Sequence, residues 1–211
     1  MIIAIDGPAG AGKGTISKFL SYQLDFATID TGLFYRALGY SVMNASASAV
    51  SNLDYLIKKA QNITLNDLSN PDLRLEDVAN IASQISVNPI IRDVITNKIR
   101  SLATDLLKSY KGVILDGRDV TTVIFPNADV KLYITADKDV RANRRKNEAN
   151  NSSIKAQVSM LITERDERDS TRKVAPLQKA DGSVEIDTTD LSIEEACAKA
   201  LQVVNNMSKG N

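Results

Sequence analysis

The chain has 211 residues, 43% of them hydrophobic and 25% charged, which is typical of a folded globular domain. Its 26 basic and 26 acidic residues cancel, so the overall charge gives no reason to expect a nucleic acid or a membrane as partner. The absence of histidine excludes a histidine base and a histidine-ligated metal, and the single cysteine, Cys197, excludes an internal disulfide. Any anion site must therefore be built from lysines and arginines.

The N-terminal segment carries the clearest motif. An apolar run at 2–5 indicates a buried strand, and apolar residues at helical spacing follow at about 16–24. Between them, Gly7-x4-Gly12-Lys13 matches the P-loop, whose glycines turn backbone N–H groups toward phosphate oxygens. The residue after Lys13 is glycine, and the hydroxyl comes one position later. We expect phosphates to be bound by Gly7, Pro8, Ala9, Gly10, Ala11, Gly12, Lys13, Gly14 and Thr15.

The N-terminus also bears on location. It has no basic region, and Asp6 interrupts the apolar run too early for a signal peptide. No stretch approaches the roughly 20 apolar residues of a membrane span. We therefore expect a cytoplasmic protein.

The middle of the chain favours helices over strands. The expected elements are a strand at 27–29, a helix at 33–43, a flexible junction at 44–52, a short helix at 53–60, an irregular stretch at 63–75, a helix from Glu76 that stops before Pro89, and a longer helix at 91–106.

The remaining chain alternates strands with helices. The expected elements are strands at 112–116, 130–135 and 184–187, helices at 138–147 and 154–168, a polar mobile stretch at 150–153, a loop at 173–182, and a last helix that a Ser192–Glu195 capping box opens. This alternation predicts an α/β fold with a parallel sheet covered on both faces. We interpret about 33–108 and 144–170 as insertions between core strands.

Charged residues gather where the predicted strands end. Asp30-Thr31-Gly32 leads to Tyr35 and Arg36, and Asp116-Gly117-Arg118-Asp119 closes a later strand. Because ligands of parallel α/β sheets bind at the carboxyl ends of strands, these clusters and the P-loop are expected to share one edge.

Two arginine-rich runs have two interpretations. Arg165, Asp169 and Arg172 lie on one helical face, and Arg141 and Arg145 are one turn apart beside Arg144. Alone, each run is typical of a solvated helix with internal ion pairs. Beside a P-loop, both favour a mobile lid that closes over phosphates.

Taken together, four motifs resemble the bacterial cytidylate kinase family over nearly the whole chain. They are Ile5-Asp6-Gly7-Pro8-Ala9-Gly10-Ala11-Gly12-Lys13-Gly14-Thr15, Asp30-Thr31-Gly32-x-x-Tyr35-Arg36, Asp116-Gly117-Arg118-Asp119, and Arg165-Asp166-x-x-Arg168-Asp169-x-x-Arg172-x-Val174-Ala175-Pro176-Leu177. The family's glycine after the P-loop lysine accounts for Gly14. One departure is that Asn62–Glu76, where the family usually has a small three-stranded sheet, looks abbreviated.

The resemblance implies a three-layer P-loop NTPase fold with a five-stranded parallel sheet in a single kinase domain. Its core would be 1–32, 109–143 and 171–211, with a nucleoside-monophosphate (NMP) binding insertion at 33–108 and a lid at 144–170. The implied reaction transfers the γ-phosphoryl group of ATP to CMP or dCMP with Mg2+. We expect a monomer with no nucleic-acid or membrane partner.

The resemblance also assigns roles to residues. Lys13, Arg36, Arg118 and Arg172 would be catalytic, and Arg141 and Arg145 would join the P-loop in binding ATP. The implied CMP-binding residues are Thr31, Tyr35, Arg36, Ser83, Arg92, Arg118, Asp119, Arg165, Asp169 and Arg172. Thr15 would reach the metal directly or through water, with Asp6 and Asp116 as further candidates.

Other functions remain open at this point. A P-loop kinase for UMP, AMP or dTMP would share most of these features. A nucleotide-binding switch without catalysis would leave the acceptor-side arginines unexplained. A purely structural domain would make every motif a coincidence.

Overall fold

The computed structural model describes residues 1–45, 52–148 and 152–208. The predicted flexible junction at 44–52 lies largely outside the described residues, as do 150 and 151 of the predicted mobile stretch at 150–153, whereas 152 and 153 are helical. The chain forms two compact units, Met1–Ile29 with Asp105–Asn211, and Asp30–Thr104.

The first unit is built on a five-stranded parallel sheet in the order β2-β3-β1-β4-β5. The strands are β1 Ile2–Asp6, β2 Ala27–Asp30, β3 Val113–Gly117, β4 Val130–Thr135 and β5 Val184–Asp187. Each lies within one residue of its predicted bounds. The predicted α/β fold with five parallel strands is therefore confirmed.

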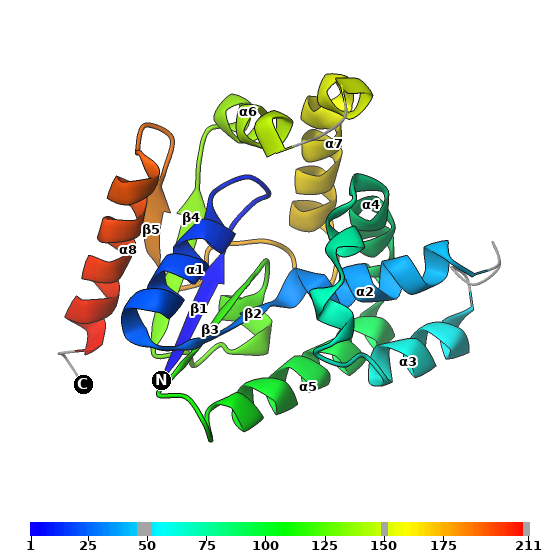
Figure 1. The fold of residues 1–211 in the computed structure, drawn as a ribbon, viewed down its shortest axis with the longest axis horizontal. Helices are drawn as coiled ribbons and strands as arrows, with labels where there is room; N and C mark the ends of the chain where they lie inside the picture. The colour runs from blue at the N-terminus through cyan, green and yellow to red at the C-terminus, as the bar shows by residue number, and fades with distance from the viewer. Residues whose placement is uncertain (46–51, 149–151, 209–211) are drawn as a thin grey trace. The chain divides into compact units, whose positions relative to one another are not determined.

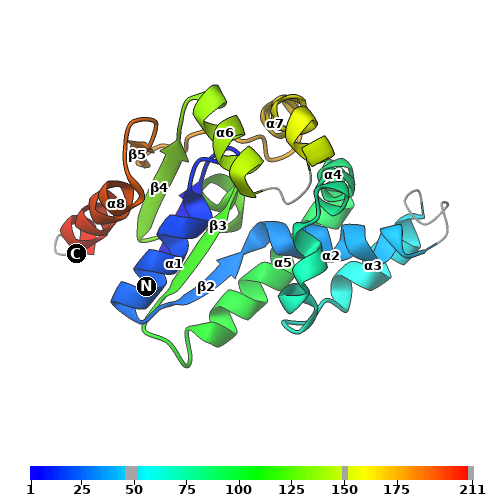
Figure 2. The same ribbon diagram turned by 45° about the horizontal axis from the view of Figure 1, so that its top comes forward.

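Four helices belong to this unit: α1 Lys13–Leu24, α6 Lys138–Glu148, α7 Ser152–Thr171 and α8 Ile193–Ser208. Apolar side chains of α1 and α8, among them Leu20 and the buried Cys197, share one core with β1, β4 and β5. Figure 1 shows α8 beside α1, and Figures 1 and 2 both show α6 next to α7. The predicted capping box opens α8, with Ser192 N donating to Glu195 Oε2 at 2.8 Å and Glu195 N to Ser192 Oγ at 3.1 Å.

The second unit is helical. It contains α2 Thr31–Met43, α3 Leu53–Gln61, α4 Glu76–Ile85 and most of α5 Pro89–Leu106. Gly39 lets α2 approach α4 closely, because a Cβ there would stand 3.1 Å from both Ala82 N and Val78 O. Residues 63–75, predicted as irregular, contain two short 3-10 helices, η2 Asp67–Ser69 and η3 Pro71–Arg74, and the described part of this unit has no strand after β2.

The described structure differs from the prediction at several points. Helix α2 begins at Thr31 and not at 33, because the Asp30 carboxylate caps it by accepting from Gly32 N at 3.0 Å. Helix α7 extends to Thr171, beyond the predicted end at 168. A π-helical turn, η4 Val120–Ile124, follows β3 and was not predicted. None of the described helices is long and apolar enough to cross a membrane.

Candidate nucleotide-binding site

The P-loop connects the end of β1 to the start of α1. Its backbone takes shapes that side chains resist, since φ is 150° at Gly7 and 76° at Gly10. A Cβ at Gly7 would collide with the carbonyl oxygen of Ile134, and one at Gly10 would lie 2.8 Å from the Arg141 carbonyl. These two glycines therefore let the loop lie directly against β4 and α6.

Lys13 is held inside this loop. Its Nζ donates to the carbonyl oxygens of Gly7 at 2.7 Å and Pro8 at 2.8 Å, and only 7% of the residue is exposed. Burial lowers the pKa of Lys13 well below its usual value, and the positive charge of Arg118 adds to this effect. An anion bound in the loop would favour the charged amine, so the lysine is poised for a phosphate.

The two strand-end acids differ in burial. Asp6 is fully buried and its carboxylate accepts from Val120 N at 2.9 Å, Thr121 N at 2.7 Å and Thr121 Oγ1 at 2.6 Å. These contacts argue against Asp6 as a metal ligand. Asp116 is half-buried, and Thr15 is exposed in the first turn of α1.

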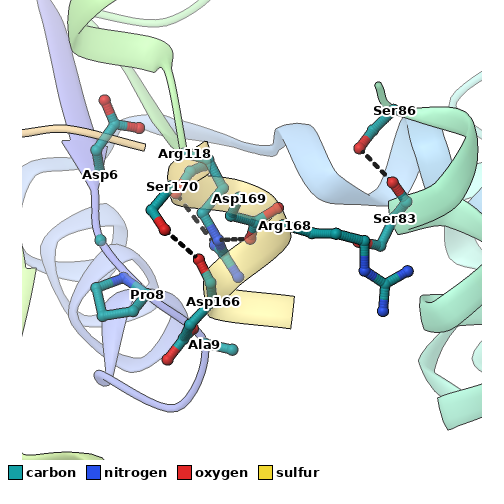
Figure 3. Close-up of polar contacts among 12 residues, drawn as sticks. Asp6, Pro8, Ala9, Ser83, Ser86, Arg118, Asp166, Arg168, Asp169 and Ser170 are labelled. Atoms are coloured by element: carbon teal, nitrogen blue, oxygen red, sulfur yellow. Dashed lines mark hydrogen bonds and ion pairs between the residues drawn. The ribbon is translucent and has the colours of Figure 1, made fainter. Parts of the chain in front are cut away.

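Two buried carboxylates and three half-buried arginines form a cluster in the same unit, which we call the arginine–carboxylate cluster: Arg118, Asp119, Arg165, Asp169 and Arg172. Arg118 Nε donates to Asp169 Oδ2 at 2.9 Å, a contact that Figure 3 shows between the end of β3 and α7. Arg172 Nη1 lies 3.8 Å from Asp169 Oδ1, and Arg172 Nη2 lies 3.6 Å from Asp119 Oδ1. The fold thus brings together residues from the end of β3, from α7 and from the residue after α7.

Asp169 is the negative centre of this cluster. Burial alone would raise the pKa of its carboxyl, but the charges of Arg118, Arg165 and Arg172 outweigh burial and hold the pKa below its usual value. Three arginines face two carboxylates, so the cluster carries a net positive charge in a shielded place. It is suited to an anion.

The arginines of α6 do not form one free face. Arg141 is buried, and its guanidinium donates to Ala9 O at 3.1 Å, to Ala136 O at 2.9 Å and to Asp166 Oδ2 at 2.5 Å. Arg141 therefore ties the P-loop to both α6 and α7. Arg144 instead donates to Thr188 Oγ1 at 2.9 Å and Thr188 O at 2.7 Å, in the loop after β5, and Arg145 is half-buried.

The second unit gathers another set of predicted residues. Arg92 is 3% exposed, donates to Ser86 O at 2.9 Å, and lies 5.4 Å from the centre of the Tyr35 ring. Ser86 Oγ in turn donates to Ser83 O at 2.9 Å, while Ser83 Oγ is buried with no hydrogen-bond partner among the described residues. Such an unpaired buried hydroxyl is ready for a ligand.

Two further observations complete this set. Thr31 is buried in the first turn of α2, and Arg36 Nη1 donates to Leu73 O at 2.7 Å, which joins α2 to η3. Ser86, which links Ser83 to Arg92, was missed by sequence reasoning. Its spacing of three from Ser83 at a helix end was the signal available. The predicted site residues thus fall into two sets, one in each unit.

Comparison with known proteins gives a consistent answer. A family model described as cytidylate kinase matches residues 3–206. The chain is 38% identical over 208 residues to a cytidylate kinase of Paramagnetospirillum magneticum, covering 97% of this chain and 98% of that protein. A cytidylate kinase of Bradyrhizobium diazoefficiens is 38% identical over 213 residues, covering 100% and 98%. The solved structure of TT1252 from Thermus thermophilus shares the fold, with a TM-score of 0.54, 17% identity, and coverage of 98% and 96%.

Proposed function

This chain belongs to the cytidylate kinase family, and from that premise we propose that it transfers the γ-phosphoryl group of ATP to CMP or dCMP, giving ADP and CDP or dCDP. The observation that carries the proposal is that a buried P-loop lysine and a cluster of three half-buried arginines lie in one compact unit. The reaction needs two anions, a donor and an acceptor, to be held against their mutual repulsion.

The P-loop is the donor half of this proposal. Its backbone N–H groups and the amine of Lys13 would bind the outer phosphates of ATP, as the order strand, glycine-rich turn and helix supports. The carbonyls of Gly7 and Pro8 hold the amine inside the loop in the structure. Arg141, bonded to Ala9, and Arg145 would support the loop from α6.

Arginines are the acceptor half. Arg118, Arg172 and Arg36 would bind the phosphate of CMP, since a planar guanidinium can donate two parallel hydrogen bonds to a phosphate. No general base is required, because a phosphate monoester with a second pKa of about 6 is largely ionised at neutral pH. This agrees with a chain that has no histidine.

Base recognition follows from hydrogen-bond chemistry. Cytosine carries an N4 amino donor where uracil carries a carbonyl acceptor, so a carboxylate attracts the first and repels the second. We assign this carboxylate to Asp119, with Ser83 and Arg92 as further base-binding residues and with Thr31 and Tyr35 as further CMP-binding residues. Arg165 and Asp169 would contact the pentose.

The residues present fit a bound Mg2+. This ion usually takes one or two protein oxygens and otherwise binds water and substrate phosphates. Thr15, exposed beside the P-loop, and the half-buried Asp116 offer oxygens of this kind. The metal would neutralise phosphate charge when ATP is bound.

The two units have separate roles in this proposal. Asp30–Thr104, which overlaps the predicted insertion at 33–108, would bind the acceptor nucleotide, and residues 144–170 would act as the lid. The protein would work as a cytoplasmic monomer.

An assay of ADP release tests the proposal directly. The protein is supplied with ATP and Mg2+ and with CMP, dCMP, UMP, AMP or dTMP at equal concentration. We expect CMP and dCMP to give the highest rates. A Lys13→Ala protein purified in the same way measures the ADP released by any contaminating kinase. A faster rate with AMP or dTMP would assign another kinase activity, and no rate with any acceptor would favour a switch.

A further inference from the structure

Asp6 is the last residue of β1 and stands directly before the P-loop, yet its side chain serves another segment. All three of its hydrogen bonds go to the start of η4: from Val120 N at 2.9 Å, Thr121 N at 2.7 Å and Thr121 Oγ1 at 2.6 Å. These partners are more than 110 residues away in the chain. The residue is fully buried.

The segment that Asp6 holds begins right after Asp119. Within the same segment, the carbonyl oxygen of Asp119 accepts from Val123 N at 2.9 Å and from Ile124 N at 3.1 Å, and these hydrogen bonds form the π-helical turn. Such turns are rare and frequently occur at functional sites. The main chain that follows Asp119 is therefore held both by Asp6 and by the turn itself, while the Asp119 carboxylate lies 3.6 Å from Arg172 Nη2.

A carboxylate suits this arrangement better than an amide does. Val120 N and Thr121 N can only donate, so a neutral amide in place of Asp6 would set its own NH2 group against one of them. Burial raises the pKa of Asp6, so keeping the charge here costs free energy.

We propose that Asp6 is a positioning residue for base selection, which holds the backbone of Val120 and Thr121 so that the Asp119 carboxylate stands where it can accept from cytosine. This inference rests on the proposed function. It also joins the two halves of the site, because the residue that precedes the P-loop sets the position of the base-reading group.

The test compares three single variants with the wild type. Asp6→Asn keeps the size of the side chain but replaces one of its two acceptor oxygens with a donor, and Thr121→Val removes only the hydrogen bond from Oγ1. Thr122→Val is the matched control, because the buried Thr122 Oγ1 has no hydrogen-bond partner among the described residues. Each protein is assayed for KM and kcat with CMP, UMP and ATP, and its thermal unfolding is followed by circular dichroism.

We expect Asp6→Asn to lower the ratio of kcat/KM for CMP over UMP by about tenfold, because it disturbs more than one hydrogen bond. Thr121→Val removes a single hydrogen bond and should lower this ratio by about threefold. The KM for ATP should change less than the KM for CMP, and Thr122→Val should behave as wild type. If Asp6→Asn does not fold, Thr121→Val alone decides the outcome.

A double variant separates positioning from a general structural role. If Asp6 acts through Asp119, adding Asp6→Asn to Asp119→Ala should leave the CMP over UMP ratio where Asp119→Ala alone puts it. An unchanged ratio in both single variants, or an equal loss with all nucleotides, would overturn the positioning role. Failure of the wild type to phosphorylate CMP would instead overturn the proposed function.

Discussion

The P-loop and the arginine–carboxylate cluster lie in the same unit but are built in opposite ways. The P-loop is one continuous stretch, and Lys13 bonds to carbonyls only five and six residues away. The cluster draws on distant segments, and Arg118 bonds to Asp169 at a separation of 51 residues. A phosphate site can thus be local, whereas this cluster exists only once β3 and α7 have come together.

The two regions also differ in charge compensation. Lys13 is surrounded by carbonyl oxygens, and burial lowers its pKa, so a bound anion would supply the missing negative charge. In the cluster, carboxylates already pair with the arginines, and the pKa of Asp169 is lowered. An acceptor phosphate would have to compete with Asp169 and Asp119 for the same guanidinium groups.

Removing the local cation should have the largest effect. Lys13→Ala is expected to reduce kcat by about 1,000-fold, since it removes a preorganised donor from charge that develops during transfer. The fold should persist, because the variant also relieves the cost of burying an ammonium group. ADP release measures kcat, and thermal unfolding measures the stability of the fold. Lys18→Ala, on the exposed face of α1, is the control. Near-normal turnover would refute the role of the P-loop.

Removing a cluster cation should have the next largest effect. Arg118→Ala is expected to lower kcat/KM for CMP by about 100-fold, because it removes one partner of a buried charge pair and leaves Asp169 with fewer contacts. Arg118→Lys keeps the positive charge but not the planar pair of donors, so its kcat/KM for CMP should lie between the values of the wild type and of Arg118→Ala. The exposed Lys111→Ala is the control. If Arg118→Lys matches wild type, then charge alone matters.

The base-reading group should have a smaller and more selective effect. Asp119→Ala is expected to narrow the CMP over UMP ratio of kcat/KM by about tenfold, the value of one specific hydrogen-bond pattern. Asp119→Asn should narrow it further, because its amide can also donate to the carbonyl of uracil. Steady-state rates with both nucleotides give the ratio, and an unchanged ratio would remove Asp119 from base selection.

The smallest effect on activity is expected at Asp169. Asp169→Asn should raise the KM for CMP a few-fold and lower the free energy of unfolding by about 1–3 kcal/mol at pH 7. Because the folded pKa lies below the ordinary 3.8, this stability is present above about pH 3.8 and is lost as the pH falls through the folded pKa. Urea unfolding of the wild type and of Asp169→Asn between pH 7 and pH 3 gives the difference in their free energies of unfolding. A difference that stays constant with pH would contradict the proposed ion pairs of Asp169.

Much of the fold was predictable because its signals are local. Apolar runs placed the strands within one residue, Pro89 marked a limit before which α4 ends, and Ser192 with Glu195 marked the start of α8. The missed features are those in which a distant partner decides. No local pattern announces that Val120 and Thr121 donate to Asp6, so the π-helical turn went unpredicted.

By itself, the sequence determined the P-loop, the alternation of strands and helices, and which charged residues end the strands, because hydrogen bonds and side-chain periodicity act over a few residues. Tertiary structure decided which of those charges meet. Asp6, a possible metal ligand by sequence, instead accepts hydrogen bonds from the start of η4. Arg141 connects the P-loop to α7, and Asp169 lies against Arg118. Burial and long-range pairing set these roles, and both depend on where the chain returns to itself.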